Sequence, residues 1–185
     1  MYITDFWMST VCFQICALIG LTYLVNKNLG SENLISFLPY FVFGLVKWTL
    51  IEYYFHRFLL HQDLKVKPLI DHHLMHHAFP NMRNKLALSI SQVAIYMIGF
   101  YFTYSFFLEK DQTISILLGV LVGLTLYDVT HYYFHFGPEI NIPFLIDLKR
   151  NHLKHHYRDP NRGFGVSNTI WDKIFATEHL SWDSS

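Results

Sequence analysis

The stretch TISILLGVLVGLTLYDVTHYYFH (113–135) decides the fold of this chain, because a long apolar segment runs directly into a pair of histidines. The segment is uncharged up to Asp128 and is long enough to cross a bilayer, which takes roughly 20 residues of helix. His131 and His135 are four residues apart, so both lie on one face of that helix. The stretch therefore predicts a membrane-spanning helix that presents two imidazoles at its end.

Three further segments satisfy the same criterion of length and apolarity, at about 6–25, 34–55 and 86–108. The connectors between the first and second and between the third and fourth segments are short, which favours antiparallel neighbours. The chain of 185 residues is 52% hydrophobic and 18% aromatic, which is more apolar than an ordinary soluble domain of this size. We therefore expect an all-α integral membrane protein with four transmembrane helices, folded as a single domain over residues 1–185.

Ten of the twelve histidines fall into four clusters, each just beyond the end of a hydrophobic segment. With four spans, all four clusters reach the same side of the membrane, where 56–85 and 136–176 would form a helical cap. Ten ring nitrogens are too many for one metal ion and suit two ions with about five ligands each. The predicted ligands are His56, His61, His73, His76, His77, His131, His135, His152, His155 and His156.

The spacing within the clusters is mostly helical. His73, His76 and His77 stand at i, i+3 and i+4, and the cluster at 152–156 repeats this spacing, so each cluster occupies one helix face. His56 and His61 are five residues apart and would diverge on an ideal helix. Either they bracket the metal pair, or the helix end that carries them is distorted.

An all-nitrogen ligand set suits zinc, copper, iron or nickel. A structural zinc ion takes four ligands and would leave six histidines unexplained, so two irons that bind O2 fit better, although zinc can fill such a site in a purified sample. Ligating histidines usually pass their second N–H to a carboxylate or a carbonyl. Glu52, Asp71 and Asp128 precede histidines by two to four residues and are the candidates for this orienting role.

Lysine and arginine are strongly biased toward the predicted histidine side, with eleven residues there and only Lys27 and Lys110 on the other. This bias predicts a cytosolic histidine face in the endoplasmic reticulum, or a matrix-facing one in the mitochondrial inner membrane. The formal net charge is zero, so no basic surplus indicates nucleic acid as a partner.

The sequence resembles the fatty acid hydroxylase and sterol desaturase superfamily, and within it the fatty acid 2-hydroxylases. The resemblance covers about 45–176 and lies in four strings: FHRFLLH (55–61), LYDVTHYYFHFG (126–137), LKRNHLKHH (148–156) and GFGVSNTIWDKIF (163–175). It implies four membrane helices beneath a cytosolic cap, two irons held by the ten histidines, and insertion of one oxygen atom from O2 at carbon 2 of a long acyl chain, often one bound for ceramide. It also implies electrons from NAD(P)H through a reductase and cytochrome b5. No cytochrome b5-like stretch precedes the spans, so we expect that partner to act in trans.

An alternative hypothesis is a metal-binding accessory subunit of a larger membrane complex, for example a respiratory one, with or without residual lipid-oxidising activity. The absence of an electron-transfer domain in the chain motivates it. Neighbouring subunits would then be the partners, in place of cytochrome b5 and its reductase.

Overall fold

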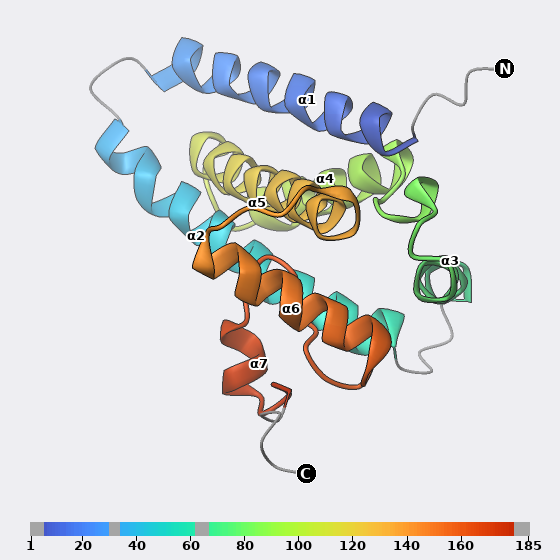
Figure 1. The fold of residues 1–185 in the computed structure, drawn as a ribbon. Coiled ribbons are helices and arrows are strands. Elements are labelled where there is room, and N and C mark those ends of the chain that lie inside the picture. The colour runs from blue at the N-terminus through green and yellow to red at the C-terminus, as the bar shows by residue number, and fades with distance from the viewer. Residues whose placement is uncertain (1–5, 30–33, 62–66, 180–185) are drawn as a thin grey trace, which may run out of the picture. The chain divides into compact units, whose positions relative to one another are not determined.

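The computed structural model describes residues 6–29, 34–61 and 67–179, and all regular structure in these ranges is helical, as predicted. The elements are α1 (Phe6–Leu29), α2 (Leu34–Tyr54), the π-helix η2 (Phe55–Leu60), α3 (Lys67–Ala78), the 3-10 helix η3 (Arg83–Lys85), α4 (Ile90–Ser105), α5 (Lys110–Phe136), α6 (Pro143–Tyr157) and α7 (Ile170–Ile174) (Figure 1). Residues 62–66 of the predicted cap lie outside the described part.

Contacts between residues divide the chain into two compact units. The first unit comprises Met1–Trp48 and Leu86–Asp128, and the second comprises Thr49–Lys85 and Val129–Ser185. The helices α2 and α5 each contribute residues to both units. All ten clustered histidines belong to the second unit. The folding of the chain as one domain stays a prediction.

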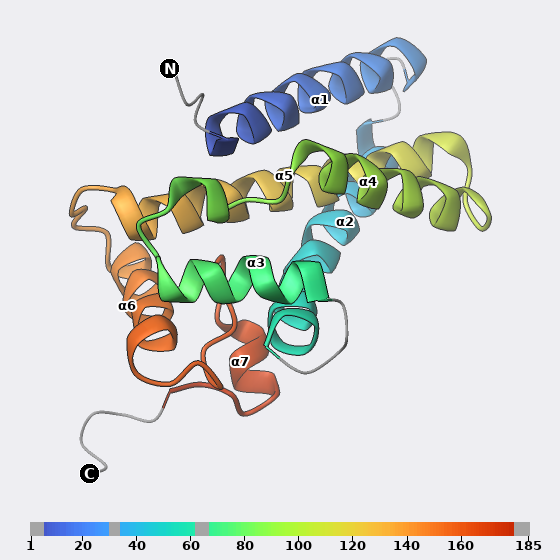
Figure 2. The same ribbon diagram turned by 90° about the vertical axis from the view of Figure 1, so that its right-hand side faces the viewer.

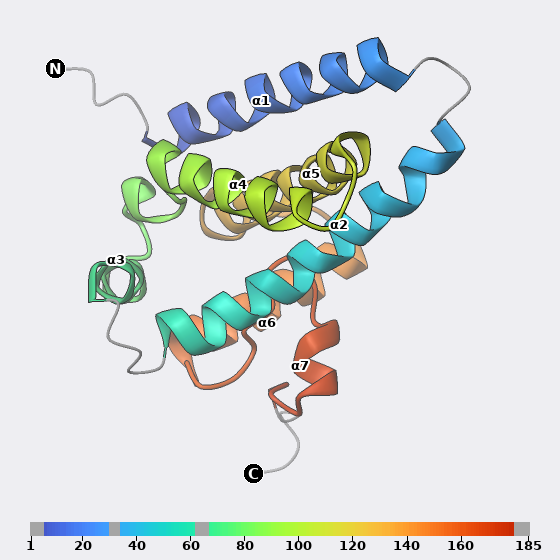
Figure 3. The ribbon, with the colours of Figure 1, turned by 180° about the vertical axis from the view of Figure 1, so that it is seen from behind.

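The first unit is built on close packing of α2 against α5. A Cβ atom on Gly44 would lie 2.1 Å from the carbonyl oxygen of Ile116, and one on Gly119 would lie 2.1 Å from that of Phe41. Only glycine permits this approach, which is a common device between membrane helices. Figure 3 shows α1, in dark blue, lying along one side of α4 and α5 in this unit.

The predicted spans correspond to α1, α2, α4 and α5, with shifted bounds. Among the described helices, α5 alone is long and apolar enough by length and composition to cross a membrane, and Trp7–Tyr23 is a shorter apolar helix. The helix α4 begins at residue 90 because Ser89 caps it, with the Ser89 side chain and Gln92 forming a capping box. Its 16 residues extend about 24 Å, less than the roughly 30 Å of hydrocarbon. The count of four spans is therefore not confirmed.

The second unit brings η2, α3, α6 and the last turns of α5 together around the histidines. Figure 2 shows α3, in green, beside α6 and the end of α2. The core of this unit includes Tyr53, Phe134, Leu148, Phe164 and Val166, all buried. The helix α6 carries Leu148, His152 and His155 on its buried face, so this face supplies both apolar packing and imidazoles.

Candidate metal centre

The structure brings all ten predicted histidines together and divides them into two groups of five. In each group the candidate ligand atoms lie within 4.8 Å of one another. The first histidine group is His56, His61, His73, His77 and His155. The second histidine group is His76, His131, His135, His152 and His156. His72 and His179 lie outside both groups.

The nitrogen spacing within each group suits a single metal ion. In the first group, the Nε2 atom of His73 lies 2.8 Å from that of His61 and 3.0 Å from that of His77. In the second, the Nε2 atoms of His76 and His131 are 3.0 Å apart. For a metal–nitrogen bond of about 2.1 Å, two ligands at right angles are about 3.0 Å apart. Both groups can therefore hold a metal ion.

The two groups adjoin one another. The rings of His77, in the first group, and His156, in the second, are stacked with centroids 4.2 Å apart. Both ring nitrogens of His156 are buried and have no hydrogen-bond partner within the described ranges. A buried imidazole without partners is costly unless a metal ion satisfies it, which is the second indication that the donor set fits a metal pair.

A π-helix explains the unusual spacing of the first cluster. The element η2 starts at Phe55, buries His56 and is capped by His61. Because a π-helix repeats its hydrogen bonds at i to i+5, it brings residues five apart onto one side. The helix end is thus distorted, and both histidines join the first histidine group in place of bracketing the pair.

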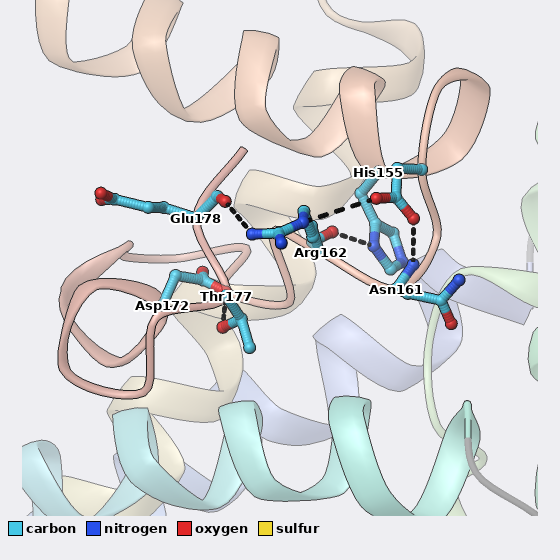
Figure 4. Close-up of polar contacts among 7 residues, drawn as sticks. His155, Asn161, Arg162, Asp172, Thr177 and Glu178 are labelled. Carbon is cyan, nitrogen blue, oxygen red and sulfur yellow. Dashed lines mark hydrogen bonds and ion pairs between the residues drawn. The ribbon is translucent and has the colours of Figure 1, made fainter. Parts of the chain in front are cut away.

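Backbone carbonyls orient two of the predicted ligands. The Nδ1 atom of His155 is 2.8 Å from the carbonyl oxygen of Arg162, as Figure 4 shows, and Nδ1 of His56 contacts the carbonyl oxygen of Phe164. An Nδ1–H that donates to a carbonyl fixes the ring orientation and leaves the Nε2 lone pair available to a metal.

Burial keeps these imidazoles neutral, which is the form that binds a metal. The pKa of His61 and that of His77 are both lowered from 6.5 to about 4, through desolvation by burial in both and, for His61, also through repulsion from His77. The pKa of His73 lies well below its usual value, because of burial first and then the repulsion of four neighbouring histidines. At neutral pH the first histidine group therefore offers lone pairs without first having to lose protons.

Two carboxylates hold the loop that covers the first histidine group. Asp172 accepts hydrogen bonds from the backbone N–H groups of Phe164 (2.9 Å) and Gly165 (2.8 Å), and from the Thr177 hydroxyl (2.8 Å). Glu52 accepts from the N–H groups of Val166 (2.7 Å) and Ser167 (2.8 Å), and from the Ser167 hydroxyl.

This loop also places an aromatic ring against the histidines. The Phe164 ring centroid lies 5.8 Å from that of His56, 5.7 Å from that of His61 and 5.6 Å from that of His155. Phe164 is buried, so its ring closes this side of the group to water. The two carboxylates, through the loop, thereby fix both the ring of Phe164 and the carbonyl that orients His56.

The three carboxylates proposed to orient ligands have different surroundings. Every hydrogen bond described for the Glu52 side chain goes to Val166 or Ser167, so it reaches His56 only through the loop. Asp128 is buried and accepts a 2.6 Å hydrogen bond from the Gln14 amide. Asp71 is exposed on α3. Their direct orienting role stays a prediction.

Sequence reasoning missed Phe164 and Asp172, although both lie in the string GFGVSNTIWDKIF. The usable signal was the pair of glycines. Gly163 has a φ of +69°, and a Cβ atom on Gly165 would lie 1.8 Å from the Asn168 carbonyl oxygen. Closely spaced glycines after a histidine cluster mark a loop forced close to other groups.

The chain is similar to known proteins in both sequence and fold. A family model described as fatty acid hydroxylase matches residues 41–177. A dihydroceramide fatty acyl 2-hydroxylase of Arabidopsis thaliana is 34% identical over 181 residues, covering 95% of this chain and 71% of that protein. The fatty acid 2-hydroxylase of Rattus norvegicus is 34% identical over 150 residues, which cover 76% of this chain and 40% of that protein.

A solved structure has the same fold. Full-length scs7p, of which only the hydroxylase domain is visible, superposes with a TM-score of 0.82 at 29% identity, covering 96% of this chain and 68% of that one. The ceramide very long chain fatty acid hydroxylase of Schizosaccharomyces pombe is 33% identical over 185 residues, and the match spans 51% of its length. The chain thus corresponds to the hydroxylase part of longer relatives.

Proposed function

We propose that this chain, which belongs to the fatty acid hydroxylase family, is an O2-dependent di-iron monooxygenase that hydroxylates a long-chain fatty acyl lipid at carbon 2. The family resemblance seen in the four sequence strings is confirmed. The observation that carries the proposal is the division of ten buried or half-buried histidines into two groups of five. The names of the relatives, which specify fatty acyl and ceramide substrates, favour a sphingolipid-type substrate.

Each histidine group would hold one iron ion. When bound, the iron pair would supply the activation of O2 and the attack on an unactivated C–H bond. One oxygen atom enters the C–H bond and the other leaves as water, so each turnover consumes two electrons and two protons. We propose that the electrons come from NAD(P)H through a reductase and cytochrome b5 in trans.

The side chains around the irons have three tasks in this proposal. The buried imidazoles stay neutral and present Nε2. The carbonyls of Phe164 and Arg162 hold His56 and His155 in orientation. The ring of Phe164 excludes water from one side of the first histidine group. Exclusion of water protects a reactive site from side reactions and strengthens its electrostatic interactions.

A membrane location would deliver the acyl substrate, and we retain four spans as part of the proposal. Ile15, Ile19 and Tyr23 form an exposed stripe on α1, at 46%, 66% and 63% exposure. Ile95, Ile98 and Phe102 form a second exposed stripe on α4. Contiguous exposed apolar side chains are typical of lipid contact. The charge bias supports a cytosolic histidine face in the endoplasmic reticulum, with the matrix face of the mitochondrial inner membrane as the alternative.

The experiment is expression of the full chain in cells that lack 2-hydroxylated sphingolipids, followed by mass spectrometry of their acyl chains. We expect 2-hydroxy species with the unaltered chain and with His72→Ala, since His72 lies outside both histidine groups. His76→Ala and His155→Ala remove one ligand from each group and should abolish the product. An unchanged lipid profile with the unaltered chain would refute the proposal.

The accessory-subunit hypothesis is not favoured, because the relatives are named as hydroxylases. A stable larger assembly in native gels, together with no change in lipid hydroxylation, would revive it.

A further inference from the structure

The helix α6 has a second face that lines a cavity, opposite to its buried face with His152 and His155. Ile146, Arg150, Leu153 and Tyr157 recur at helical spacing on this face and line a cavity of about 1130 Å³. Lys149, Lys154 and Arg158 line it beside them, and the remaining wall comes from Tyr133 near the end of α5 and from residues 139–141 in the following connector. The cavity lies entirely within the second unit.

The cavity is cationic. Four of its lining side chains are basic, Lys149, Arg150, Lys154 and Arg158, and one, Glu139, is acidic. Lys149 is held in place, since its Nζ lies 5.3 Å from the centroid of the Tyr133 ring and 3.5 Å from the carbonyl oxygen of Gly137. A concave site with this excess of positive charge attracts an anionic group.

The cavity is also apolar, which argues against a small inorganic anion as its natural occupant. Ile140, Ile146 and Leu153 line it together with the tyrosine rings of Tyr133 and Tyr157. Its volume exceeds the roughly 300–1,000 Å³ of pockets for small ligands. One of these rings, Tyr157, is 69% exposed, so the cavity opens to the surface beside an aromatic side chain. Basic, aromatic and aliphatic side chains in alternation are typical of a helix that lies against a lipid headgroup layer.

The position of the cavity directly after a candidate membrane-spanning helix also indicates a lipid headgroup as its occupant. The candidate membrane-spanning helix α5 ends at Phe136, three residues after Tyr133 and three before Glu139, both of which line the cavity. Clusters of lysine and arginine directly after a membrane span are typical binding sites for anionic lipid headgroups.

From these observations we propose that the cavity on the outer face of α6 binds the phosphate-bearing headgroup of an anionic membrane lipid. The phosphate lies among the basic side chains, and the glycerol and upper acyl carbons pack on Ile146, Leu153 and Tyr157. The bound lipid then braces α6 from the side opposite to His152 and His155. This site is separate from the histidine groups and does not depend on the proposed hydroxylase chemistry.

The test is a titration of the full chain, in neutral detergent, with fluorescent phosphatidylglycerol and fluorescent phosphatidylcholine. We expect saturable binding of phosphatidylglycerol and much weaker binding of phosphatidylcholine. Arg150→Gln removes one charge and should weaken phosphatidylglycerol binding about fivefold, and Arg150→Glu about 30-fold. Lys173→Glu is the matched control, because Lys173 is exposed on α7 and does not line the cavity.

The Tm of each variant in the same detergent, measured in parallel, reports whether the chain is still folded. Equal binding of the two lipids would overturn the proposal, as would equal losses in Arg150→Glu and Lys173→Glu. Full competition by soluble glycerol 3-phosphate at the same concentration would also overturn it, because the occupant would then be a free phosphate compound. If Arg150→Glu does not fold, Arg150→Gln with an unchanged Tm decides the outcome.

Discussion

Asp172 and Glu52 hold the same loop, yet the structure predicts that amide substitutions at the two positions will differ sharply. In Asp172→Asn, the one remaining oxygen can keep the N–H of Phe164 and the Thr177 hydroxyl as donors. The new NH2 group then takes the place of the oxygen that accepted from Gly165. Because NH2 and N–H are both donors, the buried N–H of Gly165 is left without an acceptor.

In Glu52→Gln the amide can satisfy all the hydrogen-bonding groups that the carboxylate satisfied. A single carboxylate oxygen, Oε1, accepts from both Val166 and Ser167, and the amide oxygen can take its place. The other oxygen contacts the Ser167 hydroxyl, which can accept from the new NH2 group as readily as it donated before.

An unsatisfied buried donor costs about 1–3 kcal/mol, so Asp172→Asn should lower the Tm by about 2–12 °C, at roughly 2–4 °C per kcal/mol for a chain of this size. Glu52→Gln should lower it by less than about 4 °C, because it replaces hydrogen bonds without leaving a group unpaired. Glu52→Ala, which removes both acceptors, should be at least as destabilising as Asp172→Asn.

The assay is thermal unfolding of the purified chain in detergent, followed by tryptophan fluorescence, with bound metal counted before heating. Loosening of the loop frees the carbonyl that orients His56, so Asp172→Asn should also lower metal retention. If Glu52→Gln destabilises the chain as much as Asp172→Asn, the assignment of acceptors in this loop is wrong.

Three further predictions follow from particular contacts. His156→Ala should lower bound metal by about one ion per chain, whereas His72→Ala should leave the metal count unchanged in elemental analysis, since only His156 belongs to a five-ligand group. The metal-free chain should lose stability as the pH falls from 6.5 toward 4. In the folded chain the pKa of His61 and that of His77 are lowered from 6.5 to about 4, so in this pH range protons bind preferentially to the unfolded chain. A Tm that stays constant between pH 7 and 4.5 would contradict this prediction. Gly119→Val should lower the Tm by about 2–12 °C or prevent folding, because its side chain would collide with the backbone of α2, whereas Gly99→Ala has open space and should be neutral.

Much of the fold was predictable because it depends on composition and periodicity. The long apolar segments predicted the helices α1, α2, α4 and α5, and the i, i+3, i+4 spacings predicted that α3 and α6 would each present histidines together. The predicted helices differ from the observed ones at their first and last residues. Ser89 and Gln92 start α4 later than hydropathy alone indicates, because a capping box satisfies backbone donors that hydropathy does not measure.

The sequence by itself determined the set of candidate ligands and the family, because both reside in residue identity and local spacing. Only the tertiary structure decided how the candidate ligands are divided between the two histidine groups. His76 and His77 are neighbours in the chain and so are His155 and His156, yet each pair is divided between the two histidine groups. Consecutive helical residues point about 100° apart, so the ring that each one meets depends on how α3, α6 and η2 pack against each other. The acceptor roles of Asp172 and Glu52 are tertiary for the same reason, since in both cases the loop they hold becomes their neighbour only when the chain folds.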